Sequence, residues 1–139
     1  MGVKLIVAND SVFKYFVEYM NTFAGYTVIV KSQLDNYDLS ECEELIAVQR
    51  GDWLPSHIFK TGPKISIANT EQLCDDTVEN RVNQELLDLE HNIGNRITVY
   101  DYSLKNIEKL SRLGFQTKYH PYISPLEEIN RLGIINKQP

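Results

Sequence analysis

The chain alternates short apolar runs with stretches in which apolar residues recur at helical spacing. The apolar runs predict six strands, at residues 3–8, 26–30, 45–48, 64–68, 96–100 and 115–119. Some runs, such as Tyr26–Val30, are nearly apolar throughout, which is typical of strands that are covered on both faces of a parallel sheet. The pattern therefore predicts an α/β fold with a mostly parallel sheet of about six strands.

The clearest helix is expected from Asp76 to Ile93. Asp76 and Glu79 stand at the spacing of a capping box, and Gly94 follows as a helix-ending residue. Its apolar face is predicted to contain Val78, Val82, Leu86, Leu89 and Ile93.

Other helices are predicted between the remaining strands. One follows Asp10 or Ser11, either of which can cap it, and a weak one is expected at Pro55–Lys60. The polar segment Ser32–Glu43 is expected to be a loop or a short irregular turn. Another helix follows Ser103 and is expected to place three residues on one face: Leu104, Ile107 and Leu110. The alternation predicts a Rossmann-like three-layer sandwich that forms a single lobe.

Composition and charge narrow the classes of function. The chain has 139 residues, of which 42% are hydrophobic and 24% charged, as in one ordinary globular domain. Its formal charge of −5 and the absence of a Lys/Arg run disfavour nucleic acid as the main ligand. Cys42 and Cys74 lack the spacing of a zinc site, so two buried reduced thiols and no metal are expected.

The N-terminal strand, at residues 3–8, is too short and too charged for a signal peptide or a membrane span. A cytoplasmic protein is therefore expected. A terminal helix is predicted to begin at Ser124-Pro125, where a capping serine is followed by proline at the first helical position.

Several well-known chemical motifs are missing. The first strand is followed by Asn9-Asp10-Ser11, which has neither the glycines of a dinucleotide site nor those of a P-loop. Asp10 could act as a receiver-type phosphoacceptor, although a helix cap is the simpler interpretation. His57, His91 and His120 show no metal-binding spacing, and only His120 lies at a strand exit. Trp53 could stack on a ring or simply pack in the core.

In a doubly wound sheet, ligands bind beyond the carboxyl ends of the strands. The most polar strand exit is Asn69-Thr70-Glu71-Gln72, whose side chains could hydrogen-bond a ligand's hydroxyl groups. Glu71 is a weak candidate for a general base, and His120 is the other weak catalytic candidate. The alternative is a polar loop that leads into the long helix.

The next strand exit, Asp101-Tyr102-Ser103, has the same polar character. Ser103 is expected to cap the following helix, and Asp101 could do so instead or bind the exposed amides. The same helix start could also attract a polar ligand.

The run KISIANTEQL, the long helix, ITVYDYSLKNIEKLSRLGF and KYHPY together resemble the N-terminal lobe of GT-B glycosyltransferases, especially glycosyltransferase-like proteins of bacteria and large DNA viruses. The resemblance covers roughly residues 64–123. It implies that residues 1–123 form a Rossmann-like lobe that binds a glycan or sugar acceptor. The implied acceptor-binding residues are Asn69, Thr70, Glu71, Gln72, Asp101, Tyr102, Ser103 and Tyr122, with His120 also lining the cleft.

The resemblance also implies a second, C-terminal lobe that holds the sugar nucleotide. Residues 124–139 would be the terminal helix and the start of a linker to that lobe, which this chain lacks. We therefore expect no cofactor in this lobe and no appreciable transferase activity from it alone. The rival hypothesis is a non-catalytic flavodoxin-like binding or dimerisation module. A monomer or a weak homodimer is expected, and self-association would be the sign of the rival.

Overall fold

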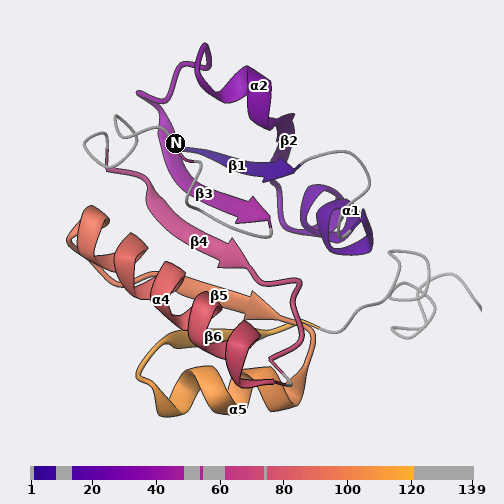
Figure 1. Cartoon of the computed structure of the whole chain (residues 1–139). Helices are drawn as coiled ribbons and strands as arrows, with labels where there is room; N and C mark the ends of the chain where they lie inside the picture. The colour runs from indigo at the N-terminus through magenta and orange to yellow at the C-terminus, as the bar shows by residue number, and fades with distance from the viewer. Residues whose placement is uncertain (1, 9–13, 49–53, 55–61, 74, 121–139) are drawn as a thin grey trace, which may run out of the picture.

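The computed structural model describes residues 2–8, 14–48, 54, 62–73 and 75–120 (Figure 1). The strands are β1 (Val3–Ala8), β2 (Thr27–Val30), β3 (Cys42–Val48), β4 (Lys64–Ala68), β5 (Thr98–Asp101) and β6 (Gln116–Tyr119). The helices are α1 (Lys14–Phe23), α2 (Lys31–Leu34), α4 (Asp76–Ile93) and α5 (Leu104–Arg112).

The strands form one six-stranded sheet in the order β2-β1-β3-β4-β5-β6, and every neighbouring pair is parallel. This confirms the α/β class and the Rossmann-like sheet predicted from the alternation of apolar runs. In the described parts of the chain, no helix has the length and apolar character needed to span a membrane.

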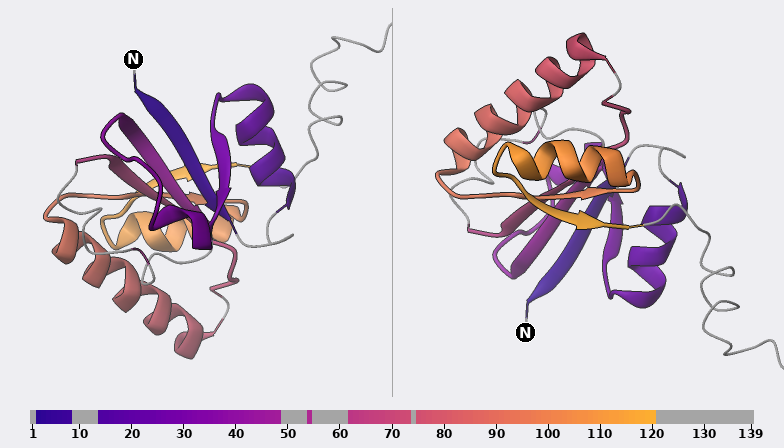
Figure 2. Two further views of the ribbon diagram at one scale, coloured as in Figure 1. Left: turned by 90° about the horizontal axis from the view of Figure 1, so that it is seen from above. Right: turned by 90° about the horizontal axis from the view of Figure 1, so that it is seen from below.

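The helices divide between the two faces of the sheet (Figure 2). Helices α2, α4 and α5 lie on one face, where their buried residues pack on alternate strand residues such as Leu5, Leu45 and Val99. Helix α1 lies on the other face and buries Phe16 and Met20 against the remaining set of strand residues. Because side chains alternate along each strand, each apolar run supplies both layers.

Ser32–Glu43, expected to be a loop or a short irregular turn, has regular structure at both ends. Residues Lys31–Leu34 form the short helix α2, in which the Gln33 carboxamide oxygen accepts a hydrogen bond from the Val30 amide. Leu34 anchors this turn, since its side chain is only 1% exposed. Strand β3 begins at Cys42, because parallel pairing with β1 extends the ladder through the polar residues before Leu45.

The long helix has the predicted bounds, but its cap was misplaced. The N-cap is Asp75, whose carboxylate accepts a hydrogen bond from the Val78 amide, and Asp76 is the first helical residue. At the other end Gly94 adopts φ +72, a left-handed conformation in which glycine is not strained.

The expected apolar face of α5 was partly wrong. Leu104 is 65% exposed, whereas Leu110 and the polar residue Asn106 are buried. Asn106 and Leu110 are four positions apart in the sequence and so lie on one side of the helix. An asparagine at this buried position needs partners, and it finds them at the ends of β4 and β5, as described below.

Some predictions fall outside the described residues. They concern the caps Asp10 and Ser11, the weak helix at 55–60, the terminal helix after 124, and the residues Trp53, His57, Cys74 and Tyr122.

Candidate functional site

The ends of β4 and β5 lie side by side and carry the polar residues that the sequence singled out. The backbone amide of Asn69 donates to the carbonyl of Tyr100 at 2.9 Å, which extends the pairing of the two strands beyond Ala68. The carboxamide nitrogen of Asn69 then donates to Oδ2 of Asp101 at 2.8 Å. Both side chains are buried, with Asn69 2% exposed and Asp101 0% exposed.

Asn106 of α5 joins this pair and completes a buried polar cluster. Its carboxamide nitrogen donates to the two carboxylate oxygens of Asp101 at 3.2 and 3.1 Å and to the carbonyl of Glu71 at 2.9 Å. Its carboxamide oxygen accepts from the amide of Leu73 at 3.1 Å. One side chain of α5 therefore holds the loop after β4 against the end of β5.

Asp101 is a buried carboxylate that is surrounded by donors. Burial raises the pKa of Asp101, and the hydrogen bonds from Asn69, Ser103 and Asn106 act in the opposite direction. Its Oδ1 accepts from the Ser103 amide at 2.9 Å, while the Ser103 hydroxyl accepts from the Asn106 amide at 3.2 Å. Asp101 and Ser103 thus both act at the start of α5, which confirms the predicted capping role of Ser103.

The outer part of the cluster is formed by residues 70–72 and Tyr102. Gln72 is exposed, and its carboxamide nitrogen donates to the Tyr102 hydroxyl at 2.7 Å. The Glu71 carboxylate is paired with the guanidinium of Arg81 on α4. For Glu71 to act as a general base, this ion pair would first have to open. Thr70 is half-buried beside them.

His120 lies apart from this cluster. Its backbone amide donates to the Asp101 carbonyl at 2.8 Å, but its ring packs edge-on against Phe16 and Tyr19 of α1, with centroid distances of 5.0 and 4.4 Å. The His120 ring therefore lies on the α1 face of the sheet, whereas the Asp101 carboxylate points toward α5. The two weak catalytic candidates, Glu71 and His120, are not brought together.

The strand order also shows where the chain changes the direction in which it adds strands to the sheet. The chain runs from β1 outward to β2 and then returns to add β3 on the other side of β1. The reversal therefore lies between β1 and β3, where ligands of doubly wound sheets usually bind. The residues that follow these strands, 9–13 and 49–53, lie outside the described part of the chain. The cluster described here begins at β4, directly beside β3.

Neither Asn106 nor Arg81 was predicted from the sequence to have a role in the site. A signal for Asn106 was present, because an asparagine four residues before the buried Leu110 falls on the inner side of its helix. Arg81 gave no such signal, since it lies on α4 ten residues after its partner Glu71 and its position depends on the direction of that helix.

Within the described residues, no group of three or more His, Cys, Asp or Glu side chains could hold a metal ion. Comparison with protein-family models, curated proteins and solved structures returns no significant match to this chain.

Proposed function

We propose that this chain binds a neutral, hydroxyl-rich ligand, a sugar or glycan acceptor, at the ends of β4 and β5, and that it serves as the acceptor-binding lobe of a glycosyltransferase. The observation that carries the proposal is the convergence of residues 69–72 and 101–103. These segments lie about thirty positions apart in the chain, yet Asn69–Asp101 and Gln72–Tyr102 hydrogen bonds join them. They are the same segments that carry the resemblance to such lobes.

The residues of the cluster divide into an inner and an outer set. Asn69 and Asn106 are buried and both donate to the buried Asp101, so the three residues position the two strand exits. Gln72 and Tyr102 lie outside them and can meet a ligand. A carboxamide and a phenol can each donate and accept hydrogen bonds, and the phenol ring offers an apolar face. This combination suits a sugar, which has hydroxyl groups at its edge and apolar C–H groups on its faces.

This proposal assigns only half of a transfer reaction to the chain. Glycosyl transfer requires that the acceptor hydroxyl be positioned in line and that the leaving phosphate be stabilised. The strand-end cluster would position the acceptor. A separate donor-binding lobe would hold the sugar nucleotide, which is a substrate of the complete enzyme. We therefore expect no transfer from a sugar nucleotide by this chain alone.

The proposal can be tested by titrating the ¹⁵N-labelled chain with neutral monosaccharides and short glycans and following backbone amide shifts. Shifts should concentrate on residues 69–73 and 101–106. Gln72→Ala should weaken binding by about threefold or more, because it removes a ligand-facing hydrogen bond. Gln84→Ala is the matched control, since Gln84 is an exposed amide that donates to a carboxylate, Asp88, four residues further along α4. Saturable shifts confined to another part of the chain would contradict the proposal.

A second candidate, a flavodoxin-like interaction module, is favoured by a different observation. The order β2-β1-β3-β4-β5 is the flavodoxin-like order, with β6 added at the edge. On the opposite edge, Val28 and Val30 of β2 are 41% and 43% exposed. Sizing chromatography with light scattering distinguishes the two candidates, because a dimer that Val28→Lys disrupts would favour the interaction module.

A further inference from the structure

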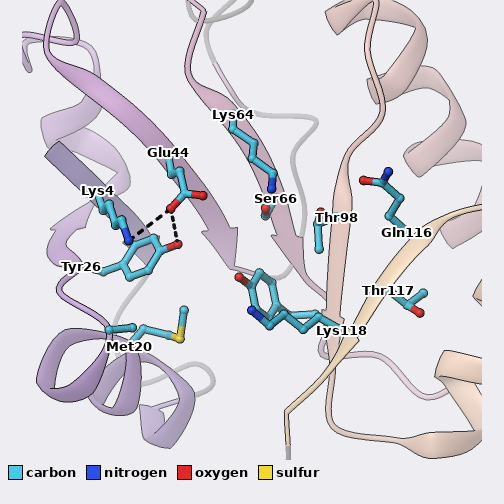
Figure 3. A pocket seen from close by; sticks show the side chains of 12 residues that line it. Lys4, Met20, Tyr26, Glu44, Lys64, Ser66, Thr98, Gln116, Thr117 and Lys118 are labelled. Atoms are coloured by element: carbon cyan, nitrogen blue, oxygen red, sulfur yellow. Dashed lines mark hydrogen bonds and ion pairs between the residues drawn. The ribbon is translucent and has the colours of Figure 1, made fainter. Parts of the chain in front are cut away.

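The face of the sheet that carries α1 contains a second polar site, a pocket of about 370 Å³ (Figure 3). Its lining includes Lys4, Glu44, Lys64, Ser66, Thr98 and Lys118, and we call it the lysine pocket. It lies on the α1 face of the sheet. The carboxylate of Asp101, in the strand-end cluster described above, is bonded to Asn106 of α5 on the other face, so the two sites are separate.

The register of the sheet explains why these residues meet. Lys4 of β1 pairs with Glu44 of β3, and Glu44 pairs with Lys64 of β4. In the next row of the same face, Ser66 of β4 pairs with Thr98 of β5. Polar residues at alternate positions of several strands thus occupy one face, because side chains two residues apart point the same way.

Helix α1 covers only the part of this face that the later residues of β1, β3 and β4 form. Its residues Phe16 and Met20 are in the apolar cluster formed by the later residues of β1, β3 and β4, such as Ala8, Val48 and Ala68. Met20 also lies at the edge of the pocket. The helix therefore forms a wall beside the polar half of the sheet, and the pocket has a floor of strands and a side of helix.

The charges in the pocket do not cancel. Its carboxylate, that of Glu44, already accepts a hydrogen bond from the Tyr26 hydroxyl at 3.0 Å and lies 3.7 Å from the Lys4 amino group. Burial, followed by the neighbouring Tyr100 and Glu44, raises the pKa of Tyr26 above its ordinary value of 10.0, so the phenol remains a donor. Among the described residues that line the pocket, Lys64 and Lys118 then leave a net positive charge.

The two remaining lysines flank hydroxyl groups on the floor. Lys64 extends toward Ser66, whose side chain is buried, and Thr98 lies half-buried next to it (Figure 3). The Lys118 amino group lies 5.6 Å from the centre of the Tyr100 ring, a cation–π contact that keeps it over the sheet. Amino groups and hydroxyls on one concave surface are the donors that bind an oxyanion.

We propose that the lysine pocket binds a small anionic metabolite that carries phosphate or carboxylate groups. Its volume lies within the usual range for small-molecule sites, about 300–1,000 Å³. The chain as a whole carries a formal charge of −5, so a positive pocket is a local departure that attracts anions selectively. The inference is independent of the proposed function, because it uses different residues and a ligand of different charge.

The test is a titration of the ¹⁵N-labelled chain at low ionic strength with inorganic phosphate, with citrate and with neutral glucose. Phosphate or citrate should cause saturable shifts in amides of residues 64–66, 98–100 and 116–118, and glucose should leave these amides unchanged. The anion that binds more tightly identifies a phosphate or a carboxylate ligand. Absence of saturation by both anions up to tens of millimolar would overturn the proposal, as would an equal response to glucose.

Variants then test whether the lysines are responsible. Lys64→Ala and Lys118→Ala should each weaken anion binding about threefold to tenfold, since each removes one charge-assisted hydrogen bond. Lys105→Ala is the control, because Lys105 is exposed on α5, on the opposite face of the sheet. All three substitutions replace exposed residues, so the fold should persist, and the spectra themselves show whether it does. Equal losses in all three variants would indicate non-specific charge effects and refute the site.

Discussion

Replacing Asn106 by alanine tests whether the buried polar cluster holds the strand-end site together. The substitution removes the donor to the Asp101 carboxylate and the acceptor for the Leu73 amide. Leu73 is 2% exposed and Asp101 is 0% exposed, so little water is available to replace the lost partner. An orphaned buried amide costs about 1–3 kcal/mol, and a lost hydrogen bond to a charged group costs about 1.5–3 kcal/mol.

Two effects reduce the net loss. Alanine is a better helix former than asparagine by roughly 0.5 kcal/mol, and Asp101 keeps its bonds from Asn69 and from the Ser103 amide. We therefore expect the free energy of unfolding to fall by about 2–4 kcal/mol. The neighbouring substitution Lys105→Ala should change it by less than about 0.5 kcal/mol, since Lys105 is exposed.

Urea unfolding followed by circular dichroism gives both free energies, and hydrogen exchange reports the Leu73 amide directly. In the Asn106→Ala variant this amide should exchange faster relative to the amides of β1. A free energy of unfolding within about 0.5 kcal/mol of the original chain, with unchanged protection of Leu73, would refute the role assigned to Asn106.

Two further predictions concern single carboxylates. Because the folded-state pKa of Asp101 is raised above its ordinary value of 3.8, its contribution to stability is present below that pH and is lost as the pH rises through the folded-state pKa. The difference in unfolding free energy between the original chain and Asp101→Asn should therefore decrease as pH rises through this window, and a pH-independent difference would contradict the assignment. Asp75→Ala should lower the free energy of unfolding by about 1 kcal/mol, because it removes the α4 cap, and Asp76→Ala should lower it less. Thermal unfolding of the two variants measures both changes. A larger loss for Asp76→Ala would place the cap at Asp76.

The sequence by itself determined the local features of this protein. The helical period from Val78 to Ile93 and the glycine that follows predicted the bounds of α4, because an amphipathic face and a C-cap depend on residues within a few positions of one another. The N-cap was placed one residue too late, at Asp76 instead of Asp75. The same locality explains why Ser103 was correctly predicted as a cap. The parallel α/β sheet was also predicted from the sequence, because apolar strands that alternate with helices are compatible with few other topologies.

Only the tertiary structure decided which polar residues act together. Asn69 and Asp101 were chosen as strand exits, but their contact with the buried Asn106 depends on how α5 packs against the loop after β4. His120 was chosen on the same ground, yet its side chain lies on the other face of the sheet, because the direction of a side chain changes with each residue along a strand.

The lysine pocket is the clearest example of a site that the sequence did not predict. Lys4, Lys64 and Lys118 lie on three strands, and in the sequence they are isolated charges that are far apart. The strand order and the register bring them to one face. Local patterns report what one segment can form by itself, whereas a site built across strands depends on pairing between segments that are distant in the chain. The six strands and the long helix could therefore be predicted from sequence, but the short helix α2 and the composition of the sites required the structure.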